Sequence, residues 1–203
     1  MRRHPVVAAA VAAYLVGFAL FGLLTRSRLT VPYVGIVAAG ALGVAFLDSR
    51  VGLTRTALIG LALWGAGHLA GGIVELDGGR ILYNGLFTRW IHFDNVVHFV
   101  GFGAAGMAAW EAIRAWFDEG RPPPRRLSVV AAVALLGMGA GALNEVVEFA
   151  LTHLLPETEV GGYENTGRDL VANMLGALTA GWLVSRRAWP ERPARRPWPG
   201  AEG

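Results

Sequence analysis

Long apolar segments constrain this chain more than any other feature of its sequence. An apolar helix needs about 20 residues to cross the ~30 Å hydrocarbon core of a bilayer. Hydrophobic residues make up 54% of the chain and charged residues only 16%, which leaves too little polarity to cover a water-soluble globule. We therefore predict an all-α, polytopic membrane protein with six transmembrane helices, at about Pro5 to Leu24, Pro32 to Leu47, Leu53 to Leu76, Phe93 to Phe117, Leu127 to Leu154 and Gly167 to Ser185.

The first segment resembles a signal peptide, because Arg2 and Arg3 precede it. It is longer than the apolar region of a signal peptide, and no small-residue cleavage site follows it, so we interpret it as a retained helix. The second segment is short and is expected to cross with little tilt.

The arginines predict the orientation of the helices. With the N-terminus inside, thirteen arginines fall on the cytoplasmic side and five on the outer side, so both termini are expected in the cytoplasm. The inner set is Arg2, Arg3, Arg50, Arg55, Arg114, Arg121, Arg125, Arg126, Arg186, Arg187, Arg192, Arg195 and Arg196, and the outer set is Arg26, Arg28, Arg80, Arg89 and Arg168. This use of arginine in short loops explains the basic charge without a nucleic-acid partner.

Residues 1–187 are thus expected to form one transmembrane domain. Residues 188–203 are rich in Pro and Arg and lack apolar periodicity, which predicts a disordered cytoplasmic tail. Glycines four residues apart, Gly67 with Gly71 and Gly137 with Gly141, predict close helix packing.

Several kinds of chemistry are excluded by composition. The chain has no Cys and no Lys, so it has no thiol nucleophile, Cys-bound metal, Schiff-base lysine or Walker-A loop. It has no G-x-S-x-G and no H-E-x-x-H motif, which argues against a rhomboid-like protease and a zincin. Asn144-Glu145 and Glu148 only superficially resemble the CAAX-processing glutamate proteases, because the paired Glu-Glu followed by Arg is missing.

The informative residues are polar ones inside the apolar segments. Ionisable groups cost ~2.5–3.5 kcal/mol each at the centre of a membrane helix, so they are expected to face one another. At helical rise, four segments place such groups within about two turns of the outer surface. We predict that they share one site, formed by His68, Asp94, His98, Glu145, Glu148, Asp169 and Asn173.

Two residues stand apart from this set. Glu75 is predicted on the same helix face as His68, two turns later. Glu111 lies 17 residues after Asp94, about 25 Å along a helix, and is expected to pair with Arg114 at the cytoplasmic end.

The residue types leave the chemistry of the site open. Imidazole and carboxylate suit Zn, Mn or Fe, whereas carboxylate with Asn suits Mg or Ca. The metal ligands would come from His68, Asp94, His98, Glu145, Glu148 and Asp169. Without a metal, Asp94, His98, Glu145, Glu148, Asp169 and Asn173 would act as acid/base groups or a proton relay. Taken singly, each residue also has a structural explanation: an acid near a helix end can cap it, as Asp169 would in the first turn of its helix, and a lone histidine can form a hydrogen-bonded helix contact.

Three stretches carry a resemblance to a known family. They are F-D-N-V-V-H-F-V-G-F from Phe93, N-E-V-V-E-F from Asn144 and R-D-L-V-A-N-M-L-G-A from Arg168. Residues 93–185 resemble the VanZ-like bacterial membrane proteins and the related YjdF-type inner-membrane proteins. The resemblance implies a polytopic protein of the bacterial inner membrane, in some members linked to tolerance of lipoglycopeptide antibiotics, with no settled reaction.

Three functions follow from these observations. The leading hypothesis is an outer-leaflet site that binds or acts on a membrane lipid or lipid-linked envelope molecule, with Arg168 as a phosphate contact and a divalent metal as possible cofactor. The second is a small proton-coupled transporter or channel that also uses Glu111. The third is a structural partner in an envelope complex.

Overall fold

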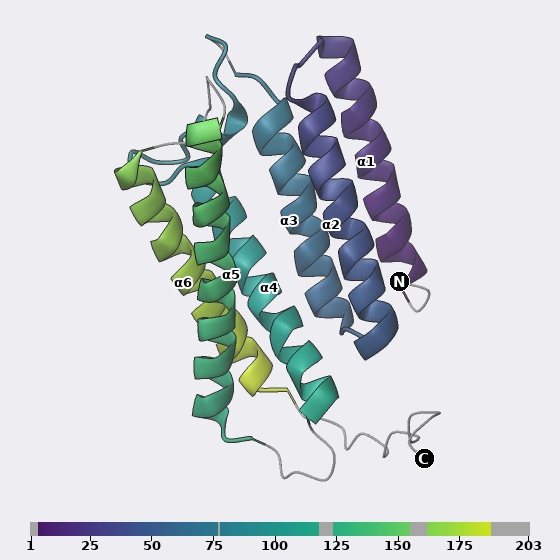
Figure 1. The fold of residues 1–203 in the computed structure, drawn as a ribbon, viewed down its shortest axis with the longest axis vertical. Helices are drawn as coiled ribbons and strands as arrows, with labels where there is room; N and C mark the ends of the chain where they lie inside the picture. Colours follow the sequence, from purple (N-terminus) through teal and green to yellow (C-terminus); the bar gives the residue numbers. More distant parts are fainter. Residues whose placement is uncertain (1–3, 77, 118–123, 155–161, 188–203) are drawn as a thin grey trace.

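The computed structural model describes residues 4–76, 78–117, 124–154 and 162–187. Within them the chain forms six long helices and one short 3-10 helix (Figure 1). Their bounds are α1 Pro5–Thr25, α2 Thr30–Val51, α3 Arg55–Ile73, η1 Leu82–Asn84, α4 Phe93–Phe117, α5 Arg126–Leu154 and α6 Tyr163–Ser185. The predicted all-helical fold is confirmed. The predicted tail, residues 188–203, lies outside the described residues.

Local signals explain where the first three helices begin and end. Pro5 opens α1, where its missing N–H removes no helical hydrogen bond. Gly52 ends α2 in the left-handed conformation, with a φ of 69°, which a residue without a side chain adopts freely. The Thr54 side chain then caps α3 by accepting a hydrogen bond from the Ala57 N–H.

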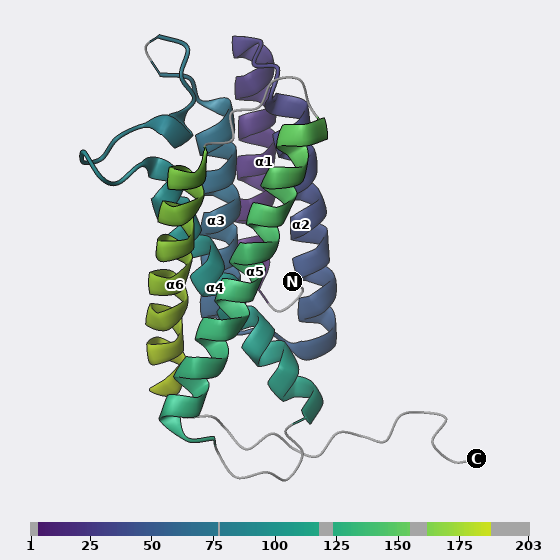
Figure 2. The same cartoon turned by 60° about the vertical axis from the view of Figure 1, so that its left-hand side comes forward.

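Five of the helices are long and apolar enough to cross a membrane: Pro5–Thr25, Thr30–Val51, Arg55–Ile73, Phe93–Trp116 and Arg126–Ala150. The α6 helix falls outside this group, and its first two turns carry Glu164, Arg168 and Asp169. It nevertheless runs along the bundle beside α4 and α5 (Figures 1 and 2). Large apolar side chains on the outer faces are exposed, Leu24 by 85% and Leu127 by 80%, as expected where lipid replaces water. The chain is a polytopic α-helical membrane protein.

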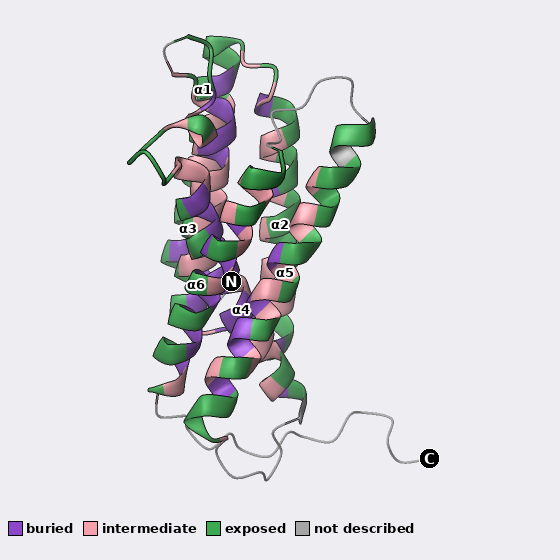
Figure 3. Ribbon diagram, turned by 90° about the vertical axis from the view of Figure 1, so that its left-hand side faces the viewer, coloured by how far each residue is buried: buried purple, intermediate pink, exposed green. Residues whose placement is uncertain are grey.

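The bundle has two halves that pack differently. Helices α4, α5 and α6 contact one another most extensively, through glycines that bring backbones together. A Cβ on Gly176 would collide with the Phe99 carbonyl oxygen, and one on Gly137 would lie 2.6 Å from the Phe102 carbonyl oxygen. Helices α1, α2 and α3 form the other half, and buried residues line the inner faces of the bundle (Figure 3).

Three predicted helix bounds are corrected by the structure. The α3 helix ends at Ile73 rather than Leu76, and Glu75 instead forms an isolated bridge with Ile81, so it shares no helix face with His68. The α2 helix has 22 residues and is not short. The α6 helix begins at Tyr163, so Glu164, and not Asp169, is the acid of its first turn.

Candidate functional site

The α4, α5 and α6 helices bring the predicted polar residues together at one end of the bundle. Asp94 and His98 lie in the first two turns of α4, Glu145 and Glu148 near the end of α5, and Asp169 in the second turn of α6. Because α5 runs antiparallel to α4 and α6, these helix ends lie at the same level of the bundle (Figure 1). We call the whole group the acidic cluster: Asp94, Asn95, His98, Asn144, Glu145, Glu148, Asn165, Asp169 and Asn173.

His98 is the centre of the acidic cluster. Its ring Nδ1 lies 3.1 Å from Asn173 Oδ1 and 3.8 Å from Glu145 Oε1, while Nε2 lies 3.5 Å from Asp94 Oδ1. An amide oxygen only accepts, so Nδ1 donates its hydrogen to Asn173. Contact with an ionised Asp94 then requires a second proton, on Nε2.

Asp169 is fully buried, and both of its oxygens are hydrogen-bonded. Asn95 Nδ2 donates to Oδ1 over 2.8 Å, and Asn165 Nδ2 donates to Oδ2 over 2.7 Å. Two amide donors therefore compensate part of the cost of burying this carboxylate. Asn95 also accepts from the His92 backbone N–H, which ties the start of α4 to α6.

Glu145 differs sharply from Asp169. Its side chain is 9% exposed, yet neither carboxylate oxygen has a hydrogen-bond partner among the described residues. Glu148, one turn later, is held by Asn144, whose Nδ2 donates to Glu148 Oε1 over 2.7 Å. The buried Asn173 Nδ2 also has no hydrogen-bond partner in the part of the chain that the structure describes. Such unpaired buried groups are rare in folded proteins and call for an explanation.

Two overlapping sets in the acidic cluster bring three candidate metal ligands close together. Asp94, His98 and Asp169 form one, and His98, Glu145 and Glu148 form the other, with the ligand atoms of each set within 4.8 Å of one another. His98 belongs to both sets. The residues that the structure gathers thus include five of the six predicted metal ligands.

The sixth predicted ligand, His68, belongs to neither set. It lies on α3, and its Nδ1 forms a short hydrogen bond with the Tyr83 hydroxyl of the loop before α4. Burial raises the pKa of Tyr83, and the neighbouring Tyr33 and Asp94 add to this, so the hydroxyl stays protonated. Ring contacts from His68 through Trp64 and Phe102 reach His98. His68 therefore neighbours the acidic cluster without joining it.

Arg168 pairs with a residue outside the acidic cluster. It forms an ion pair with Glu164 one turn earlier on α6, whose side chain is 81% exposed. The predicted phosphate contact thus lies at the edge of the site, beside Asp169 in sequence.

Glu111 lies at the opposite end of α4, and its predicted partner is corrected by the structure. Its Oε2 accepts from the Thr54 backbone N–H over 2.8 Å, and its Oε1 accepts from the Thr54 hydroxyl over 2.7 Å. Arg187, and not Arg114, is the arginine of this ion pair, with Nη1 3.3 Å from Oε1. We call these three residues the Glu111 cluster.

Sequence reasoning missed several contributors. Asn165 lies before the predicted start of the sixth helix, although its i,i+4 spacing to Asp169 was readable. Tyr83 lies in a loop, where no periodicity points to it. Thr54 and Arg187 are far from Glu111 in sequence, so only the packed helices reveal their contact.

These features define a polytopic α-helical membrane protein with a buried cluster of ionisable groups between three of its helices. The chain belongs to the family described as predicted membrane protein (DUF2238), whose profile matches residues 5–189. That match includes α1, α2 and α3, where the sequence offers no nameable motif. No curated protein and no solved structure matches the chain.

Proposed function

We propose that this chain is a VanZ-like protein of the bacterial cytoplasmic membrane whose acidic cluster binds or acts on a lipid or lipid-linked envelope molecule. The observation that carries the proposal is Glu145, a buried carboxylate without a hydrogen-bond partner among the described residues, beside three further acids. The arginine bias favours a position of this cluster in the outer half of the membrane.

Energetics favour a role in binding over a role in stability. Ionisable groups within membrane helices are costly and usually mark functional sites. A buried carboxylate stabilises a fold only when partners offset its desolvation, and among the described residues Glu145 has only a 3.8 Å contact with His98 and a weak interaction with Thr166. A ligand that approaches Glu145 would supply the missing interactions.

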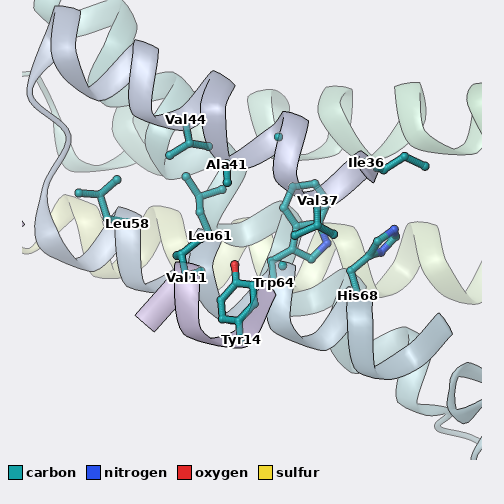
Figure 4. Close-up of a pocket in the computed structure, with 13 residues that line it drawn as sticks. Val11, Tyr14, Ile36, Val37, Ala41, Val44, Leu58, Leu61, Trp64 and His68 are labelled. Carbon is teal, nitrogen blue, oxygen red and sulfur yellow. The ribbon is translucent and has the colours of Figure 1, made fainter. Parts of the chain in front are cut away.

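An apolar cavity supports a ligand with a hydrocarbon chain. It lies between α1, α2 and α3, and Figure 4 shows Leu58 near one end and His68 near the other. These two residues are ten apart on α3, or about 15 Å along the helix. His68 is also the residue that ring contacts connect to His98. A lipid tail in the cavity would therefore extend from a head group near the acidic cluster.

Arg168 is the proposed contact for a phosphate-bearing head group. Its partner Glu164 is exposed, and such surface pairs are worth only ~0–1 kcal/mol, so exchange of Glu164 for a phosphate costs little. The four acids of the cluster repel a phosphate, however, so its binding requires a compensating cation. The next subsection argues for that cation from the contacts.

The transporter hypothesis gains no support from the contacts of Glu111. A proton path would need polar groups between the two clusters, but α4 from Phe99 to Trp110 has only apolar and glycine residues. Glu111 itself is fully occupied by Thr54 and Arg187.

The test compares variants in cells at matched membrane abundance. Glu145→Gln and Asp169→Asn should lose most of the effect of the protein on glycopeptide tolerance and lipid composition, whereas Glu164→Gln should keep it. Glu145→Gln is the cleaner change, because Asp169→Asn also disturbs a hydrogen bond from an asparagine. Wild-type behaviour of both variants would contradict the proposal and leave the structural-partner function.

The lipid tail has its own matched pair of variants. Gly40 and Gly43 both lie on α2 with no atom within 4 Å of an added Cβ, but only Gly40 lines the cavity. Gly40→Phe should fill the cavity and reduce the lipid that co-purifies with the protein, measured by mass spectrometry. Gly43→Phe should retain it. Equal lipid in both variants would contradict a tail in this cavity.

A further inference from the structure

Glu145 is a buried side chain that points to a missing ligand. The Glu145 side chain is about nine-tenths buried, and both of its oxygens lack hydrogen-bond partners among the described residues. Asn173, on a different helix, is fully buried and places its Oδ1 beside His98. Both side chains approach the same ring nitrogen of His98, at 3.8 Å and 3.1 Å. A small ligand at this point would contact all three.

Glu148 offers a second carboxylate to such a ligand, and its position is already fixed. Asn144 donates to Glu148 Oε1, which orients that carboxylate, and His98, Glu145 and Glu148 each offer a ligand atom within 4.8 Å of the others. Ligands of one divalent transition metal, at ~2.0–2.2 Å from it, lie roughly 3.4 Å apart. The ligand atoms of this set lie within 4.8 Å of one another, and small side-chain rotations would bring them to the shorter spacing.

The alternative set around Asp169 is less suited to an ion. Both Asp169 oxygens accept hydrogen bonds from asparagines, so that carboxylate is stabilised without a metal. Asp94 is better placed as a partner of the histidine, because its Oδ1 faces His98 Nε2. Metal-bound histidines usually donate their other ring N–H to a carboxylate. With a metal on Nδ1, His98 would donate to Asp94 in this way.

We propose that His98, Glu145 and Glu148 bind one divalent transition-metal cation, of the Zn²⁺ or Mn²⁺ type. Imidazole with carboxylate oxygens is the ligand combination these ions accept. Asn173 Oδ1, next to the same ring nitrogen, offers a further oxygen. The inference rests on the proposed function only in its consequence: the cation would offset the acids and let the site hold a phosphate head group.

Metal binding to the purified full-length protein in detergent tests the inference directly. After removal of metal with a chelator, the wild type is titrated calorimetrically with Zn²⁺ and with Mn²⁺. Glu145→Gln and Glu148→Gln should weaken binding at least 100-fold. Asp94→Asn should weaken it about 10- to 100-fold, as a change in a partner of a metal ligand does. Glu164→Gln, an exposed acid on α6, is the matched control and should bind as the wild type does.

Thermal unfolding separates lost binding from lost folding. The wild type should unfold at a higher temperature with metal, while Glu145→Gln should unfold at an unchanged temperature with or without it. Absence of binding to the wild type, or wild-type affinity in both glutamine variants, would overturn the inference.

The cellular experiment distinguishes this inference from the proposed function. If metal fails to bind but Glu145→Gln still abolishes the cellular effect, the proposed cation site is wrong and the proposed lipid site is still supported. If metal binds at Glu145 and Glu148 but their variants behave as wild type in cells, the cation is supported and the proposed function fails.

Discussion

Glu111 and Glu145 are both buried carboxylates on membrane-spanning helices, but they differ in what surrounds them. Glu111 is 3% exposed, and Thr54 and Arg187 occupy its two oxygens. Glu145 is 9% exposed, and its oxygens have no hydrogen-bond partner among the described residues. One chain thus contains a buried acid whose interactions are complete and another whose interactions are not.

We interpret this difference as a structural use of charge at Glu111 and a ligand-binding use at Glu145. Glu111, on α4, connects Thr54 at the start of α3 with Arg187, two residues after the end of α6, so its hydrogen bonds hold three helices together. Glu145 holds no helix in this way. Its burial destabilises the protein unless a ligand completes it, which is the expected property of a binding site.

Reporter fusions test which side of the membrane each of the two clusters faces. The arginine bias predicts that reporter fusions after Leu24 and at Gly78 are periplasmic, and that fusions after Arg121 and at the C-terminus are cytoplasmic. The acidic cluster would then face the outer leaflet. A periplasmic C-terminus would reverse the comparison and place the acidic cluster on the cytoplasmic side.

Removal of the arginine from the Glu111 cluster should destabilise the protein. Arg187→Met removes a charged donor from Glu111 while it keeps most of the side-chain length. Hydrogen bonds to charged groups contribute ~1.5–3 kcal/mol, so we expect a loss of about 2 kcal/mol in thermal unfolding in detergent.

The neighbouring Arg186 provides the control for this change. It stacks over Trp182 at 4.0 Å, a contact worth ~0.5–1 kcal/mol at an exposed site, so Arg186→Met should have the smaller effect. Equal losses in the two variants would show that Glu111 contributes no special stability.

Substitution of a glycine beside the acidic cluster should lower the free energy of unfolding by an amount comparable to the Arg187→Met loss. A Cβ on Gly141 would press into the buried Asn173 amide, with Asn173 Cγ at 2.7 Å, so Gly141→Ala should cost about 1–3 kcal/mol. It should also weaken metal binding, because Asn173 contacts His98. Gly139→Ala, on the same helix with no atom within 4 Å, should be neutral or slightly stabilising. Equal stability of both variants would contradict the tight packing of α5 against Asn173.

Much of this organisation was predictable, for reasons that differ between residues. Apolar length predicts the six helices, and i,i+4 spacing places Asp94 with His98 and Asp169 with Asn173. The cost of intramembrane charge then predicts that these residues converge. Periodicity carries no information on loops, so the partnership of Tyr83 with His68 was not predictable, and the end of α3 was placed three residues too late.

The partners of buried acids on other helices could also not be predicted from the sequence. Helical depth correctly separates Glu111 from the acidic cluster, but it favours the nearby Arg114 over Arg187, which is distant in sequence. Which buried acid remains unpaired depends on the rotation of each helix about its axis. Glu145 and Glu148 therefore look alike in the sequence, and only the structure shows that Asn144 holds Glu148 alone.

The most direct test of the contrast is the stability of two isosteric variants, Glu111→Gln and Glu145→Gln, unfolded in the same detergent without added metal. Breaking a buried ion pair costs ~3–5 kcal/mol, so Glu111→Gln should lose at least about 2 kcal/mol. Glu145→Gln should lose nothing and is expected to gain up to about 1 kcal/mol, because it removes an uncompensated charge beside Glu148. A loss in Glu145→Gln as large as that in Glu111→Gln would contradict the claim that Glu145 is held for a ligand rather than for the fold.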